Sequence, residues 1–162
     1  MRVSSDTDEP TIEVVASETG LVVVRTLFRE YAAGLGVDLG FQQFEQELAQ
    51  LPGSYIAPSG TLLLCRVHDE PAGCVAVRRW SEEAAELKRM FVRDRSRGRG
   101  YGSLLLRRAL AFARAAGYKR ILLDTLPSMG DAQAAYRKAG FREREAYRFN
   151  PVPGTAFMEL EL

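Results

Sequence analysis

The chain has 162 residues, enough for one domain with a sizeable core. It is 46% hydrophobic and 27% charged, and its 22 basic residues almost balance its 21 acidic ones, which leaves a net charge of +1. This balance argues against a protein that its overall charge draws to nucleic acid or to an anionic membrane.

The N-terminal third of the sequence predicts a polar N-terminal segment, one strand and two helices. Residues 1–9 are polar and are expected to be disordered, so that residues 10–162 form a single domain. The sequence TIEVV at 11–15 predicts a strand. Apolar residues at helical spacing predict a helix over 17–35 and a second over 41–51, which end at glycine and at Pro-Gly respectively.

The rest of the chain predicts a three-stranded meander followed by alternating strands and helices. In chain order these elements are strands at 61–67, 72–80 and 85–92, a helix from Gly102 or Ser103 to Ala116, a strand at 121–125, a short helix ending at Gly140, and strands at 141–149 and 155–162. Ser128 and Asp131 have the spacing of a capping box at the start of the short helix.

The resulting order is βααβββαβαββ, which predicts an α/β fold. We expect a mixed, mostly antiparallel sheet of six or seven strands, with four helices distributed over both faces. The segment from 85 to 125 reads as strand, loop, helix and strand, and such a crossover should join two parallel strands.

The sequence also indicates the compartment. The N-terminus has no apolar signal region, and no apolar run approaches the ~18 residues of a membrane span, so we expect a cytoplasmic protein without a membrane partner. The two cysteines, Cys65 and Cys74, are too few for a disulfide framework or a metal cage, so we expect buried free thiols and no metal. A hairpin turn at 69–70 would make the two cysteines cross-strand neighbours.

The stretch RGRGYGS, Arg97 to Ser103, lies between a predicted strand and a predicted helix. A helix N-terminus offers unpaired amides and a partial positive charge, and glycines let backbone approach a ligand closely, so the turn could hold a pyrophosphate. The alternatives are an ordinary loop, a dinucleotide-binding turn, a Walker A loop and a nucleic-acid-binding RGG segment. The glycine spacing is GxGxG rather than GxGxxG, and no GK[ST] follows.

The turn matches the [Q/R]-x-x-G-x-[G/A] signature of the GNAT acetyltransferase superfamily. The strand AELKRMFV before it, the helix after it, the segment DAQAAYRKAGF at 131–141 and a C-terminal hairpin resemble that family in the same order. ELKRM, DTLPSM and NPVPG resemble a bacterial branch with undefined acceptors. The resemblance is strongest over residues 60–162.

The resemblance implies binding of acetyl-CoA as a co-substrate. The strand before the turn would splay from its neighbour, and its backbone would pair with the pantetheine amides and polarise the thioester carbonyl. The cofactor-binding residues it implies are Met90, Phe91, Val92, Arg97, Gly98, Arg99, Gly100, Tyr101, Gly102 and Ser103. The acceptor amine would attack directly in a ternary complex, without an acyl-enzyme.

Tyr136 matches the family tyrosine that protonates the leaving thiolate, a role that suits a phenol with a pKa of about 10. The alternative is that Tyr136 only packs its helix against the core. One position departs from the family pattern: Met129 stands where many members have an asparagine that contacts the cofactor. Ser128 would serve instead, or the contact is lost.

Glu86 matches a strand position where several members place a general base for the incoming ammonium group. It precedes Met90 by four residues, about 13 Å along an ideal strand, so it would act through water or across a bend. An ion pair with Lys88 and deprotonation by solvent are the alternatives.

The acceptor-side loops suggest further residues. NPVPG, with Tyr147 and Asn150 beside it, resembles the acceptor loop of the family, and Tyr31 would face the same cleft. The resemblance implies a small-molecule or peptide amine as acceptor, and a homodimer is common in the family. Two other functions remain open, namely a non-catalytic acyl-CoA-binding module and nucleic-acid binding by the arginines.

Overall fold

The computed structural model describes residues 9–162, so residues 1–8 of the segment expected to be disordered lie outside the described part. Within it, strands and helices follow the predicted order. They are β1 (Thr11–Val14), α1 (Glu18–Leu35), α2 (Phe44–Gln50), β2 (Thr61–Val67), β3 (Glu70–Arg79), β4 (Ala84–Val92), α3 (Tyr101–Ala115), β5 (Arg120–Thr125), α4 (Gly130–Ala139), β6 (Arg142–Arg144) and β7 (Ala156–Glu161), with short 3-10 helices η1 (Gly40–Gln42) and η2 (Asp94–Ser96).

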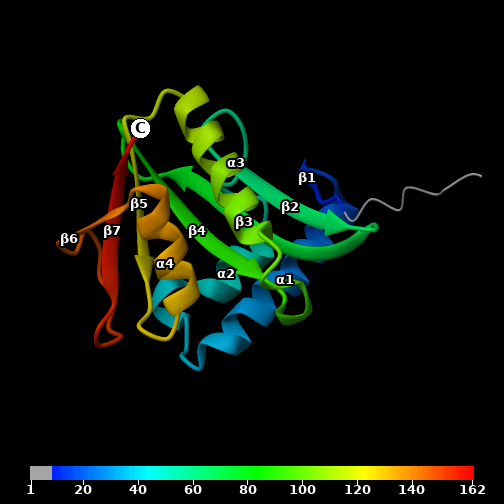
Figure 1. Ribbon diagram of the computed structural model, residues 1–162, viewed down its shortest axis with the longest axis horizontal. Coiled ribbons are helices and arrows are strands. Elements are labelled where there is room, and N and C mark those ends of the chain that lie inside the picture. The colour runs from blue at the N-terminus through cyan, green and yellow to red at the C-terminus, as the bar shows by residue number, and fades with distance from the viewer. Residues whose placement is uncertain (1–8) are drawn as a thin grey trace, which may run out of the picture.

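The strands form one seven-stranded sheet in the order β1-β2-β3-β4-β5-β7-β6. Neighbouring strands are antiparallel except β4 and β5, which α3 connects and which run parallel. Helices α3 and α4 cover one face, and α1 and α2 cover the other (Figure 1). The predicted mixed, mostly antiparallel sheet with helices on both faces is confirmed.

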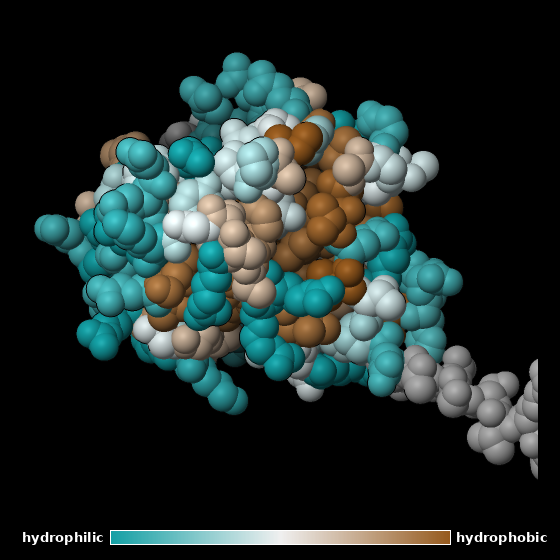
Figure 2. Space-filling view, turned by 90° about the horizontal axis from the view of Figure 1, so that it is seen from above, coloured by the Kyte–Doolittle hydropathy of each residue, from teal (hydrophilic) through white to brown (hydrophobic). Residues whose placement is uncertain are grey.

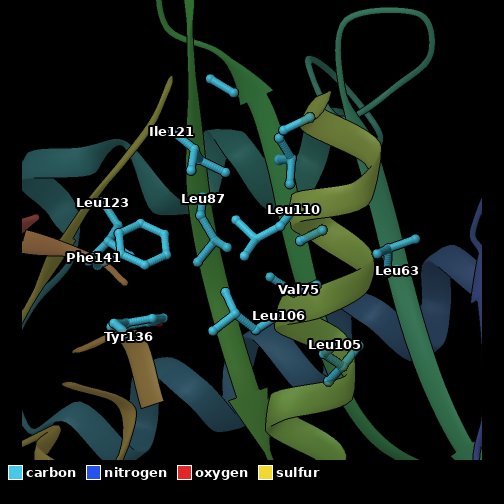
Figure 3. Close-up of a cluster of buried hydrophobic side chains, with 14 of the residues drawn as sticks. Leu63, Val75, Leu87, Leu105, Leu106, Leu110, Ile121, Leu123, Tyr136 and Phe141 are labelled. Atoms are coloured by element: carbon cyan, nitrogen blue, oxygen red, sulfur yellow. The ribbon is translucent and has the colours of Figure 1, made fainter. Parts of the chain in front are cut away.

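The first core layer lies between the sheet and α3. Leucines of α3 pack on apolar residues of β2 to β5, and Tyr136 of α4 lies beside Phe141 at the edge of this cluster (Figure 3). Leu105 and Ile121 are fully buried. The buried apolar side chains of α3 therefore hold this helix against the sheet, with its N-terminus next to the end of β4.

The second core layer lies under α1 and α2, where Val24, Leu27 and Phe28 are fully buried. Seen from above, the outline of the molecule is mostly hydrophilic, and apolar residues reach the surface in the middle of that face (Figure 2). No helix in the described part of the chain is both long and apolar enough to cross a bilayer.

Local signals explain most of the helix ends. Ser17 caps α1, and its hydroxyl accepts a hydrogen bond from the Gly20 amide at 3.2 Å. Gly36 ends the same helix in the left-handed conformation, with φ at 68°. The capping box predicted at Ser128 is wrong: Met129 occupies the N-cap position of α4, and no side chain caps that helix.

Three predicted boundaries are corrected. Helix α2 begins at Phe44 because residues 40–42 form η1 instead. Helix α3 begins at Tyr101, one or two residues earlier than predicted. The strand predicted over 141–149 ends at Arg144, because the following residues turn in toward the sheet and bind a buried carboxylate.

The two cysteines are buried free thiols, as predicted, but they are not cross-strand neighbours. The hairpin turns at residues 68–69 rather than 69–70, and with a register shift between Cys65 and Arg66 this pairs Cys65 with Gly73 and Leu64 with Cys74. The two side chains consequently enter opposite core layers, Cys65 on the α3 side and Cys74 on the α1 side.

Candidate active site

Strand β4 separates from β5 partway along its length. The two strands pair only at Ala84, Ala85 and Glu86, whereas β5 continues to pair with β7 as far as Thr125. The strands diverge below this point (Figure 1). The edge of β4 from Leu87 onward thus lacks a strand partner on the β5 side, and its backbone groups on that side can bind a ligand.

A β-bulge bends β4 at the same place. Cys74 pairs with Phe91 and Ala76 pairs with Lys88, so that Arg89 and Met90 together oppose a single residue of β3. Arg89 has a φ of 59°, which is unusual for a residue other than glycine. The bulge includes Met90, the first of the strand residues predicted to bind the cofactor.

A buried ion pair holds this bulge. The Arg89 guanidinium donates two hydrogen bonds to the Glu47 carboxylate, from Nε at 2.9 Å and from Nη2 at 3.0 Å. It also lies over the rings of Phe44 and Tyr31, at 5.2 and 5.7 Å from their centroids. Burial alone would lower the pKa of Arg89, but the hydrogen bonds and charge of Glu47 raise it well above the ordinary value. Helices α1 and α2 therefore fix the shape of β4.

The glycine-rich turn places free backbone amides beside the opening between β4 and β5. Gly100 is the N-cap of α3 with φ at 85°, and no side chain caps the helix. Leu104 donates to the Gly100 carbonyl at 3.0 Å, so the amides of residues 101–103 precede the first such bond. A Cβ added at Gly98 or Gly100 would meet nothing within 4 Å. The glycines therefore leave open space beside a positive helix end.

The arginines near this turn differ in their partners. Arg97 Nε donates to the Val92 carbonyl at 3.1 Å, and its Nη1 lies 3.2 Å from Asp94 Oδ1. Arg93 turns inward, where it forms a bidentate pair with Glu30 at 2.6 and 3.0 Å. Arg99 is exposed and forms no ion pair with any residue of 9–162. The arginines near the turn are thus divided between structural ion pairs, formed by Arg93 and Arg97, and an exposed charge, that of Arg99.

A small polar pocket lies where β4 and β5 separate. Its lining combines side chains from both strands with residues of α1, η1 and α4: Tyr31, Gln42, Leu87, Lys88, Arg89, Met90, Asp124, Met129 and Tyr136. Three of the predicted site residues, Tyr31, Met90 and Tyr136, meet here, together with Met129, which stands where many family members have an asparagine.

Tyr136 lies at the junction of this pocket with the core. It is 4% exposed, and its ring packs against Phe141 with centroids 5.6 Å apart. Within residues 9–162 its hydroxyl forms no hydrogen bond. Burial, followed by the nearby Tyr31 and Asp124, raises the pKa of Tyr136 well above its ordinary value. The phenol therefore stays protonated at neutral pH.

Glu86 is fully buried and does not line the pocket. Its Oε1 accepts from Arg78 Nε at 2.9 Å, and its Oε2 accepts from Arg148 Nη1 at 2.9 Å and from the Tyr147 hydroxyl at 2.6 Å. Burial would raise the pKa of Glu86, but the charges of Lys88, Arg148 and Arg78 lower it below its usual value. The ion pairs of Glu86 are with arginines rather than with Lys88, the partner considered from the sequence.

The other residues suggested for the acceptor side fasten the loop between β6 and β7. Tyr147 binds Glu86 and packs edge-on against Trp80, with ring centroids 4.9 Å apart. Asn150 Nδ2 donates to Asp124 Oδ2 at 3.0 Å, and its own Oδ1 accepts from the Val152 amide. Neither Tyr147 nor Asn150 lines the pocket, whereas Tyr31 does.

Sequence reasoning gave no pocket role to Gln42, Lys88 and Asp124, which line it. The charged residues carried a signal, since Lys88 follows Glu86 by two positions on an otherwise apolar strand and Asp124 interrupts a buried strand. Gln42 carried none. Among the described residues, no group of three or more histidine, cysteine or acidic side chains is arranged to hold a metal ion.

Comparison with known proteins agrees with this geometry. The family model described as "Acetyltransferase (GNAT) family" matches residues 24–141. An uncharacterized N-acetyltransferase of Schizosaccharomyces pombe is 36% identical over 140 residues, which cover 85% of this chain and 86% of that protein. N-acetylaspartate synthetase of Rattus norvegicus is 34% identical over 110 residues, 67% of this chain and 37% of that protein.

Solved structures show the same fold. The crystal structure of an acetyltransferase from Streptococcus agalactiae superposes with a TM-score of 0.77 over 94% of this chain and 98% of that one, at 21% sequence identity. With the family match, the splayed strands and the uncapped helix all in agreement, the chain belongs to the GNAT family and is an N-acetyltransferase, an enzyme of acyl transfer.

Proposed function

We propose that this protein transfers the acetyl group of acetyl-CoA to a primary amine of a small-molecule or peptide acceptor, by direct attack in a ternary complex. The observation that carries the proposal is the convergence of two features at one opening. The unpartnered edge of β4 begins after Glu86, and α3 opens with an uncapped glycine beside the end of that strand.

The glycine turn would hold the pyrophosphate. A Cβ added at Gly98 or Gly100 would enter open space, and the first turn of α3 contains no acidic residue. These features suit an anion held by backbone amides at a helix N-terminus. Arg99 adds a rim charge, and Arg97 contributes less because its guanidinium also binds Val92 and Asp94.

The edge of β4 would hold the pantetheine arm. Backbone groups of Met90, Phe91 and Val92 would pair with its amides in the manner of an added strand, and an amide of the bulge would donate to the thioester carbonyl. The Arg89–Glu47 pair fixes this geometry before any ligand binds. Preorganised donors of this kind stabilise developing negative charge without reorganisation.

Tyr136 would donate its proton to the departing thiolate. Its hydroxyl is protonated at neutral pH, faces the same pocket as Met90 and has no competing partner within residues 9–162. General acid catalysis of this kind contributes roughly 10²- to 10⁴-fold.

Solvent, rather than Glu86, would take the proton of the acceptor ammonium. The Glu86 carboxylate already accepts hydrogen bonds from two guanidiniums and a phenol, and its lowered pKa makes it a weak base. We therefore assign Glu86 to holding the loop between β6 and β7 against the sheet.

The cysteines give no support to an acyl-enzyme route. Both are fully buried in the core layers, neither lines the pocket, and burial raises the pKa of both thiols. A thiol in that state is a poor nucleophile. Direct attack by the amine needs no such intermediate.

Release of CoA thiol from acetyl-CoA, measured with a thiol-reactive dye across a panel of primary amines, tests the proposal. We expect release that depends on at least one amine and falls by tenfold or more in the Tyr136→Phe variant. Tight binding of acetyl-CoA without thiol release for any amine would instead indicate a binding module.

A further inference from the structure

Lys88 is a buried cationic side chain with few interaction partners. It projects from β4 into the polar pocket and is only 6% exposed. Its Nζ donates to Gln42 Oε1 at 3.3 Å, and among residues 9–162 it forms no ion pair with a carboxylate. An ammonium group has three donors, and burying one without an anion is costly.

Two neighbouring carboxylates, those of Glu86 and Glu47, are already engaged by other cations. Glu86 is shared by the guanidiniums of Arg78 and Arg148, at 2.8 and 2.9 Å. Glu47 forms an ion pair with Arg89. The charge of Lys88 is consequently the one in this cluster that no direct ion pair balances.

Opposite Lys88, the pocket carries a negative charge. Asp124 lies on β5 and lines the same pocket, and Asn150 holds one of its carboxylate oxygens, Oδ2, at 3.0 Å. The opening between the strands thus has a cation on the β4 side and an anion on the β5 side. A ligand with both charges matches this arrangement.

We propose that Lys88 binds a carboxylate of the acceptor while Asp124 accepts a hydrogen bond from its amine, so that the acceptor is an amino acid or another amine bearing a carboxylate. This inference rests on the proposed transfer to an amine and adds the class of that amine. Lys88 is then a specificity-determining residue, since it would favour an acceptor with a carboxylate over the same amine without one.

The electrostatics of Lys88 give this inference a signature. Burial first, and then the charge of Arg89, lower the pKa of Lys88 to about 7, although Glu86 opposes this. An arriving carboxylate would raise that pKa again, so binding should take up a proton. The charged or titratable groups that face Lys88 from the surrounding elements are Tyr31, Glu47, Arg78, Glu86, Arg89, Asp124, Tyr136 and Arg148.

Matched acceptor pairs test the substrate class. The rate of CoA release is compared for L-alanine and L-alaninamide, and for L-phenylalanine and L-phenylalaninamide, which differ in the carboxylate. An amide of this kind has the less basic amine, so intrinsic reactivity at neutral pH favours the amide. We expect the wild-type protein to reverse this preference by roughly tenfold or more in kcat/KM.

The Lys88→Met variant tests the residue, with Lys119→Met as the control because Lys119 is an exposed lysine paired with Glu83. We expect Lys88→Met to raise KM for the amino acids by roughly 10- to 100-fold, the effect of losing a hydrogen bond to a charged group, and to change KM for the amides by less than about threefold. Equal losses in kcat for acids and amides would overturn the inference and point to a proton-transfer role.

Calorimetric titration separates this inference from the proposed function. The same amino acids are titrated into the protein saturated with CoA, at pH 6.5 and pH 8.5. Binding that weakens at the higher pH in the wild type, and is lost in Lys88→Met, supports the carboxylate site even if no amine is acetylated. Absence of binding, or binding that Lys88→Met leaves unchanged, overturns it.

Discussion

Gly100→Ala tests the pyrophosphate site, and Gly117→Ala provides a matched control at the other end of α3. The two glycines have nearly the same φ, 85° and 89°, and an added Cβ meets nothing within 4 Å at either position. The left-handed conformation costs an alanine roughly 1–2 kcal/mol, which for a domain of this size lowers Tm by about 2–8 °C. We expect this loss of stability to be the same in both variants.

The two variants should differ only in cofactor binding. The Cβ at position 100 enters the space beside the amides of residues 101–103, whereas position 117 lies outside the opening. We expect the Kd of acetyl-CoA, measured by calorimetry, to rise at least about tenfold, or about 1.4 kcal/mol, in Gly100→Ala and to stay within about twofold in Gly117→Ala. Equal affinity in the two variants would refute the assignment of the turn.

Three further substitutions have distinct expected outcomes. Arg99→Ala should weaken acetyl-CoA binding less than Gly100→Ala does, and the effect should shrink at high salt, because an exposed charge is screened; a larger effect would argue against backbone recognition. Tyr136→Phe should keep the packing on Phe141 and leave Tm within about 2 °C of the wild-type value. It should lower kcat by roughly tenfold or more, with acetyl-CoA binding unchanged. An unchanged kcat would assign Tyr136 to packing alone. Glu86→Gln should destabilise the protein by about 1.5–3 kcal/mol at pH 7, since it removes the anion that two half-buried guanidiniums share. The pKa of Glu86 is lowered in the folded protein, so the stability that its ionised form contributes is present above the ordinary carboxyl pKa of about 4 and is lost as pH falls through the lowered value. In thermal unfolding, the difference in stability between Glu86→Gln and the wild type should therefore shrink below pH 4. A difference in stability that stays constant with pH would contradict the ion-pair role.

The order of elements could be predicted from the sequence because each signal is local. Helical spacing of apolar residues marks α1 and α3, and glycines mark their ends. The glycine-rich turn and Tyr136 were recognised because their motif is contiguous or nearly so. These features need no knowledge of what lies across the sheet.

The features that the sequence did not predict depend on contacts between distant segments. The strand predicted over 141–149 is cut short because Tyr147 and Arg148 bind Glu86, more than 60 positions away. The bulge in β4 is held by Glu47 from α2, and alternation along the strand gives no sign of it. The role proposed for Lys88 follows from Glu86 and Glu47 being paired with arginines, which only the three-dimensional arrangement reveals.

A crystal structure with acetyl-CoA bound tests the central claim most directly. The account predicts the pyrophosphate against the amides of residues 98–103, the pantetheine arm along the free edge of β4, and the thioester beside Tyr136. Pyrophosphate bound elsewhere would contradict the account, for example in the open groove beside α1 and α2 that Ala32, Leu39 and Phe44 line.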